Sequence, residues 1–411
     1  MNILSIESSC DESAISILEA KGGVKKTSFK ILGNNIASQV KLHAQYGGVF
    51  PMMAKREHAK NLIPLLKKTL KEAKILYPVS GIEYLVSKKV KIILNREPEL
   101  LEQFLEFIPT IQKPNIDAIA VTYGPGLEPA LWVGINFAKA LAIVWDIPVI
   151  PVNHMEGHIL SALKKGGNKF SISNFQFPML SLLISGGHTE LVLVKKWMNY
   201  KIIGETRDDA VGEAFDKVAR MLNLPYPGGP QISKLAGSSR SKSGKTPGVK
   251  DTPTPEVEED FDLFPPVKLP RPMINSGDFD FSFSGLKTAV LYLLRELGKL
   301  NNNQKIAIAK EFQDAATEVL TSKTMKAAKK FKVRTILVGG GVSANKQIRT
   351  TLIKAAKKEK INIHFPEKGL SVDNSIMIGM AGYFRFLSKS KKPNIRTLKA
   401  CGNLKIGTTT L

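Results

Sequence analysis

Two stretches of the sequence decide the fold: residues 3–18, ILSIESSCDESAISIL, and residues 179–194, MLSLLISGGHTELVLV. Each has two short apolar runs around a polar or glycine-containing turn, a pattern that predicts a strand, a tight turn and a returning strand. Strand-like and helical patterns alternate after each hairpin, with buried strands expected at 116–126 and 334–344. We therefore expect a duplicated α/β unit, with two lobes and a ligand cleft between them.

The length also favours two lobes, because 411 residues are too many for one compact core. We assign residues 1–165 to the first lobe and interpret the mixed pattern at about 78–114 as an insertion. The second lobe is assigned to residues 178–411, whose last segment can pack back on the first lobe. Residues 237–270, rich in Ser, Pro, Lys and Glu, are expected to form a flexible surface insertion.

Composition excludes several classes of protein. Hydrophobic residues make up 43% of the chain, which is normal for a folded protein and excludes wholesale disorder. Two cysteines are too few for a disulfide framework and indicate a reducing, cytoplasmic setting. We expect no signal peptide, since the first residues lack its basic and apolar regions. We also expect no membrane span, because the most apolar stretch, residues 129–145, is interrupted by Asn136 and Lys139.

The formal net charge is +23, and the excess of positive charge is uneven. Residues 321–361 hold twelve Lys or Arg against one acid, and residues 385–399 add six more. One interpretation is a surface that follows the phosphates of a nucleic acid and gives affinity without sequence specificity. The other is an ordinary solvated helix face, and the sequence alone does not separate the two.

The segment HMEGH, residues 154–158, carries the strongest chemical signal. Histidines four residues apart project from one face of a helix and can share a metal ion. In the zinc-protease motif HExxH, the glutamate directly follows the first histidine and reaches the metal-bound water. Glu156 instead lies about 200° around the helix from both histidines, so the general base of a peptidase is missing.

A third metal ligand must come from elsewhere in the chain. Asp373, which leads an apolar segment assigned to the second lobe, is the best candidate. A metal bound there would tie the two lobes together. The alternative is that one histidine caps the helix and the other fills the core.

Two glycine turns, SGGHT at 185–189 and GGGVSAN at 339–345, offer sites for an anion. Glycines let backbone N–H groups approach a phosphate closely, and the helix after the second turn presents its positive N-terminus. Such turns often only join a strand to a helix, so the pair is better evidence than either alone. Asp209 is expected to cap the next helix, and Asp216 can bind ribose hydroxyls or pair with a neighbouring cation.

In ordered motifs over nearly the whole chain outside the two insertions, the sequence resembles the TsaD family of tRNA N6-adenosine threonylcarbamoyltransferases, once labelled O-sialoglycoprotein endopeptidases. The motifs are ESSCDES, GPGL, NHMEGH, SGGHTEL, DDAVGEAFDKVARMLNLPYPGGP, FSFSGLKTAV, GGGVSANKQIR and DNSIMIG. The resemblance implies a two-lobed actin/Hsp70-like (ASKHA) fold. It also implies transfer of a threonylcarbamoyl group from threonylcarbamoyl-adenylate to N6 of adenosine 37, with release of AMP, in tRNAs that read codons beginning with A.

The resemblance further implies roles for individual residues. One divalent ion, Fe²⁺ or Zn²⁺, would be bound by His154, His158 and Asp373. Asp11 and Glu12 correspond to acidic residues of the family's active cleft, and Asp11 is our candidate for the general base. The residues implied to bind the adenylate are Leu183, Ile184, Ser185, Gly186, Gly187, Asp216, Gly229 and Asn345. The implied partners besides tRNA are a TsaB-like paralogous subunit and a TsaE-like ATPase.

Three other functions stay open at this point. A kinase of the same fold would transfer the γ-phosphoryl group of ATP through a Mg²⁺ site and would have no use for the paired histidines. A metallopeptidase is disfavoured by the position of Glu156. A non-catalytic tRNA-binding scaffold would tolerate the loss of both histidines. Asn153 stands where the family often has a histidine, which leaves the two expected ligands intact.

Overall fold

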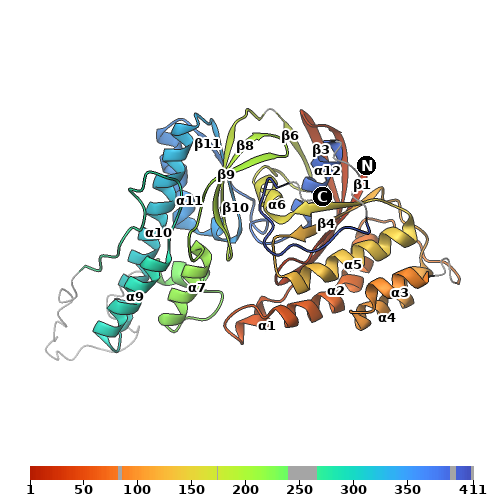
Figure 1. The fold of residues 1–411 in the computed structure, drawn as a ribbon, viewed down its shortest axis with the longest axis horizontal. Coiled ribbons are helices and arrows are strands. Elements are labelled where there is room, and N and C mark those ends of the chain that lie inside the picture. Colours follow the sequence, from red (N-terminus) through yellow and green to blue (C-terminus); the bar gives the residue numbers. More distant parts are fainter. Residues whose placement is uncertain (82–85, 174, 239–265, 389–394, 409–411) are drawn as a thin grey trace, which may run out of the picture.

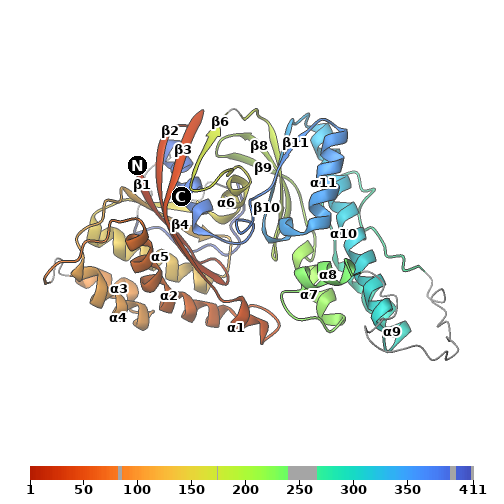
Figure 2. The same ribbon diagram turned by 180° about the vertical axis from the view of Figure 1, so that it is seen from behind.

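The computed structural model describes residues 1–81, 86–173, 175–238, 266–388 and 395–408. Figure 1 shows two sheets side by side with helices packed around them, and the reverse view in Figure 2 shows α6 (His154–Ser161) between the sheets. None of the helices in these ranges is both long and apolar enough to cross a membrane.

The first sheet has six strands in the order β5–β4–β1–β2–β3–β6. The antiparallel hairpin predicted from residues 3–18 is present as β1 (Asn2–Glu7) and β2 (Glu12–Gly23). The antiparallel side continues with β3 (Lys26–Ser38) and β6 (Lys169–Ser173). On the other side of β1 lie two parallel strands, β4 (Ala118–Gly124) and β5 (Val149–Asn153).

The second sheet has five strands in the order β11–β10–β7–β8–β9. Its antiparallel strands are β7 (Met179–Ile184), β8 (Thr189–Lys196) and β9 (Asn199–Glu205), and its further parallel strands are β10 (Thr335–Gly339) and β11 (Asn362–His364). The first five strands of each half thus follow the same spatial order. The predicted duplicated α/β architecture is confirmed.

One face of the first sheet is covered by α2 (Pro51–Glu72) and α5 (Glu128–Trp145), while α1 (Val40–Ala44) precedes α2. The described part of the 78–114 stretch forms α3 (Lys88–Leu94), α4 (Pro98–Phe107) and the 3-10 helix η1 (Ile108–Thr110). Leu94, Leu100 and Phe104 are fully buried in the same core, so this stretch extends the hydrophobic core of the lobe. Two short helices in succession explain why no single period is seen in the sequence.

The helices of the second half are α7 (Val211–Met221), α8 (Gly228–Ala236), α9 (Ser284–Leu297), α10 (Asn302–Lys330), the 3-10 helix η2 (Gly341–Ala344) and α11 (Lys346–Lys358). α10 begins at Asn302, because Asn301 and Gln304 form a reciprocal capping box there. Most of the predicted 237–270 insertion, residues 239–265, lies outside the described residues.

The last helix, α12 (Ser375–Leu387), packs against β1 and β2 of the first sheet. A Cβ atom on Gly379 would lie 2.5 Å from the Leu18 side chain, and one on Gly382 would lie 2.6 Å from Ala120 Cβ, so the glycines allow close helix–sheet packing. The expectation that Asp373 leads a helix of the second lobe is therefore wrong. The helix belongs to the first sheet, on the face opposite α2 and α5.

Candidate metal centre and ligand cleft

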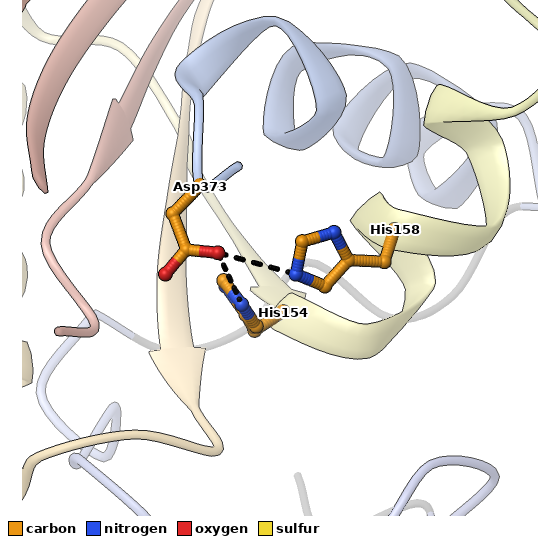
Figure 3. A group of neighbouring side chains, drawn as sticks. All are labelled: His154, His158 and Asp373. Atoms are coloured by element: carbon orange, nitrogen blue, oxygen red, sulfur yellow. Dashed lines mark ion pairs between the residues drawn. The ribbon is translucent and has the colours of Figure 1, made fainter. Parts of the chain in front are cut away.

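The structure brings His154, His158 and Asp373 together, although Asp373 is more than 200 residues away in sequence. Figure 3 shows both imidazoles directed at one carboxylate oxygen. Each Nε2 atom lies 3.2 Å from Asp373 Oδ1, and the three potential ligand atoms lie within 4.8 Å of one another. We call these three residues the trio.

Local sequence positions the trio. β5 ends at Asn153, whose side chain accepts a hydrogen bond from Met155 N and so caps α6. The cap is therefore Asn153 and not a histidine, and the two histidines follow on one face of the helix. Asn374 caps α12 in the same way by accepting from Met377 N, which places Asp373 just before the helix.

The chemistry of the trio fits a divalent metal ion. Both imidazoles are buried, and His158 Nδ1 has no hydrogen-bond partner in the described part of the chain. Burial and the charge of His154 lower the pKa of His158, which favours the neutral imidazole that binds metals. Burial opposes ionisation of Asp373, but the charge of His154 and the hydrogen bonds of both imidazoles outweigh it and lower its pKa. Two imidazoles and a carboxylate suit Zn²⁺ or Fe²⁺ and leave coordination positions open.

Glu156 does not take part in the trio. Both of its carboxylate oxygens accept hydrogen bonds of 2.7 Å from Arg385 on α12. Arg385 lies ten residues into α12, about 15 Å along the helix axis from its start beside Asp373. Glu156 thus points away from the trio, as the helical spacing predicted. It does not occupy the position of the general base in an HExxH peptidase.

The acidic turn between β1 and β2 lies near the trio. Asp11 and Glu12 are both buried. Burial, followed by the charges of Asp373 and Asp11, raises the pKa of Glu12 to about 10, so this carboxyl group holds a proton at neutral pH. Burial, and then the charge of Asp11, also raise the pKa of Tyr226 in the second lobe.

The glycine turns divide into two groups. A Cβ atom on Gly186, Gly187 or Gly341 would meet nothing within 4 Å, so these residues border open space. A Cβ atom on Gly339 would lie 2.6 Å from His158 O, and one on Gly340, whose φ is +88°, would lie 2.3 Å from Ile184 O. The first group leaves room for a ligand, whereas the second lets β10 pack against α6 and β7.

The residues in the first glycine turn and those just before it have different environments. The side chains of Leu183 and Ile184 are fully buried in the core, so only their backbone can face a ligand. Ser185 Oγ accepts from His188 N at 3.1 Å and shapes the turn. Burial, and then the charges of His154 and His158, lower the pKa of His188 to about 4, so this turn lies beside the trio. The motif SGGHT contains His188, but nothing in the sequence indicates that this histidine lies beside the trio.

Two other predicted ligand-binding side chains are engaged in local structure. Asp216 Oδ1 accepts from Gly228 N at 2.7 Å and holds the turn that contains Gly229. Asn345 Oδ1 accepts from the first N–H groups of α11, and its Nδ2 donates to Gln313 Oε1 at 2.8 Å. Both side chains therefore shape the loops in which they lie.

Asp209 does not cap α7, contrary to expectation. The capping position is Ala210, which makes no side-chain cap. The Asp209 carboxylate instead accepts from Lys217 Nζ at 2.8 Å and Lys287 Nζ at 2.9 Å. Two lysines compete successfully with the backbone for this carboxylate, which joins α7 to α9.

Fold and site together define a duplicated α/β protein with a His–His–Asp trio suited to a metal ion. The family model described as TsaD, tRNA N6-adenosine threonylcarbamoyltransferase, matches residues 30–82 and 96–380. This protein belongs to the TsaD family, as the sequence motifs predicted.

Curated proteins named tRNA N6-adenosine threonylcarbamoyltransferase are similar over most of their length. The protein of Persephonella marina is 40% identical over 94% of this chain and 90% of its own. The protein of Burkholderia mallei is 39% identical over 94% of this chain and 92% of its own. The protein of Chromobacterium violaceum is 40% identical over 94% and 93%. Residues 83–95, which include the whole of α3, lie between the two matched segments of the family model.

Proposed function

We propose that this protein transfers the threonylcarbamoyl group of threonylcarbamoyl-adenylate to N6 of adenosine 37 in tRNAs that read codons beginning with A. It would thus act as an N6-L-threonylcarbamoyladenine synthase, an acyltransferase. Family membership supports the reaction. The structural observation that carries it is the convergence of the trio, the acidic turn and the two glycine turns. Ser9 Oγ of the acidic turn lies 3.2 Å from His154 Nδ1, and a Cβ atom on Gly339 would lie 2.6 Å from His158 O.

The chemistry explains why such a site is needed. The donor is a mixed anhydride of a carbamic and a phosphoric acid, so AMP leaves as the new N6–C bond forms. The acceptor amine is a poor nucleophile because its lone pair is delocalised into the adenine ring. Positioning and stabilisation of developing charge must therefore supply most of the rate enhancement.

Each group has a proposed part in this transfer. Backbone N–H groups at Gly186 and Gly187 face open space and are suited to the phosphate of the leaving AMP. Asp11 is proposed to accept the proton lost from N6, while its neighbour Glu12 stays protonated. One Fe²⁺ or Zn²⁺ ion held by the trio would polarise the carbamoyl oxygen or hold the threonyl carboxylate.

We further propose that the basic surface contacts the tRNA away from the reacting base. Lys357 and Lys358 end α11, and Lys360 follows it; all three are exposed. They lie about 20 Å along the helix from Asn345, a proposed adenylate-binding residue. Phosphates of the tRNA body suit this position better than those of the anticodon loop. On the family resemblance, a TsaB-like subunit and a TsaE-like ATPase are proposed partners, and the cytoplasm is the proposed location.

The function is tested by analysing tRNA nucleosides. The protein is incubated with tRNA, threonine, bicarbonate, ATP and the adenylate-forming enzyme, and the product is measured by mass spectrometry. We expect N6-threonylcarbamoyladenosine with the wild type and none with His158→Ala, which should also lose metal on elemental analysis. His364→Ala, a half-buried histidine on β11, is the matched control and should retain both. Full product with metal-free His158→Ala would support a scaffold and refute a metal-dependent transferase.

A further inference from the structure

Glu7 is a buried carboxylate at the end of β1, next to the trio. It is the last residue of β1 and is fully buried. Its Oε2 atom lies 3.0 Å from His154 Nδ1, the ring nitrogen on the side away from Asp373. Its Oε1 accepts from Ser9 N at 2.6 Å, and Oε2 accepts from Thr122 Oγ1 at 2.7 Å. Both oxygens are therefore held in place.

The sheet explains why these groups meet. β1, β4 and β5 are neighbouring parallel strands, so their carboxyl ends lie at the same edge. Ile6 pairs with Val121, which places Glu7 beside Thr122 at this edge. His154 follows directly after β5 and points its ring back over the same edge. The arrangement thus depends on strand register and not on a flexible loop.

We propose that Glu7 is a positioning residue that fixes His154 as a metal ligand. A carboxylate facing Nδ1 holds the proton on that nitrogen, which leaves the Nε2 lone pair directed at Asp373 and the metal position. The negative charge also makes the imidazole a more basic ligand. The inference rests on the proposed metal site but not on the identity of the reaction.

Ser9 is the competing explanation, because its Oγ lies 3.2 Å from the same Nδ1. A charged acceptor at 3.0 Å forms a stronger hydrogen bond than a neutral hydroxyl at 3.2 Å, so Glu7 dominates. His158 has no equivalent, since its Nδ1 has no partner among the described residues. The two histidines are thus unequal ligands, and the orientation of His154 is the one that the protein sets in advance.

The test measures Zn²⁺ binding to metal-free protein by competition with a chromophoric chelator. Glu7→Gln keeps the shape of the side chain but presents an N–H group or a neutral oxygen to Nδ1. We expect it to raise the dissociation constant for Zn²⁺ about 10- to 100-fold. Glu7→Asp, which retains the charge, should bind Zn²⁺ more tightly than Glu7→Gln. Ser9→Ala is the matched control and should stay close to the wild type.

A Zn²⁺ dissociation constant of Glu7→Gln within twofold of the wild type would overturn the proposal. An equal loss of Zn²⁺ affinity in Ser9→Ala would also overturn it. If Glu7→Gln does not fold, as judged by circular dichroism, ¹⁵N-histidine NMR of the Zn²⁺-loaded wild type decides. His154 should carry its proton on Nδ1, and metal ligation through Nδ1 would refute the idea. A wild type that fails to bind Zn²⁺ removes the metal site and this inference together. A wild type that binds Zn²⁺ but makes no modified nucleoside overturns only the proposed function.

Discussion

The ion pair between Glu156 and Arg385 joins the helix that carries both histidines to the helix that follows Asp373. Arg385 donates from Nε to Oε2 and from Nη2 to Oε1, each at 2.7 Å. The Glu156 side chain is 2% exposed and the Arg385 side chain is 18% exposed. Burial raises the pKa of Glu156 and the guanidinium offsets part of that rise, while Glu156 raises the pKa of Arg385 against the effect of burial. We take the two-pronged geometry to be that of an ionised pair.

Glu156→Ala should destabilise the protein strongly. Removing one partner of a buried ion pair typically costs about 3–5 kcal/mol, because the remaining charge loses its compensation. Replacing both partners by apolar residues of similar volume is often neutral. Glu156→Leu in an Arg385→Met background should therefore cost much less than Glu156→Ala or Glu156→Leu in the wild type.

The assay is denaturant unfolding of the metal-free single and double variants, followed by circular dichroism. The double-mutant cycle isolates the pair from other contacts of Arg385, and we expect a coupling energy of about 2 kcal/mol or more. Metal content should fall far less in Glu156→Ala than in His158→Ala, since Glu156 does not contact the trio. A loss below about 1 kcal/mol in Glu156→Ala, or additive single effects, would show that the pair contributes no net stability.

Three further predictions concern single residues. Gly340→Ala must place a Cβ atom 2.3 Å from Ile184 O at a φ of +88°, so we expect a clear loss of thermal stability. The Cβ atom of Gly187→Ala would meet nothing within 4 Å, so this variant should keep its thermal stability but bind AMP more weakly, as measured by calorimetry. Equal losses of stability in Gly340→Ala and Gly187→Ala would contradict the assignment of Gly340 to packing and Gly187 to open space. Burial, and then the charge of Glu205, raise the pKa of Glu190 from 4.5 to about 7. The folded state therefore binds more protons than the unfolded state between these values, and stability falls as the pH rises through this window. Glu190→Gln should remove that pH dependence and raise the free energy of unfolding by at most about 3 kcal/mol above pH 7, as measured by denaturant titration at pH 5 and 8. An equal gain in stability at both pH values would show that the raised pKa of Glu190 is not the cause.

The local elements and their order can be predicted from the amino-acid sequence. The hairpins at 3–18 and 179–194 follow from apolar runs around polar turns, and repetition of that pattern predicted the duplicated fold. The spacing of His154 and His158 placed them on one helical face, because a helix turns once in 3.6 residues. These features depend on near neighbours along the chain, so they can be read without a structure.

Which helices and strands pack against one another is known only from the three-dimensional structure. No local pattern shows that α12 packs on the first sheet, so the position of Asp373 relative to the lobes was predicted wrongly. Glu7 stands out in the sequence only as an acid ending an apolar strand, and its contact with His154 depends on the register of three strands. Arg385 likewise meets Glu156 across 229 residues of chain. Such contacts are set by packing between elements distant in sequence, and no period within a single element encodes them.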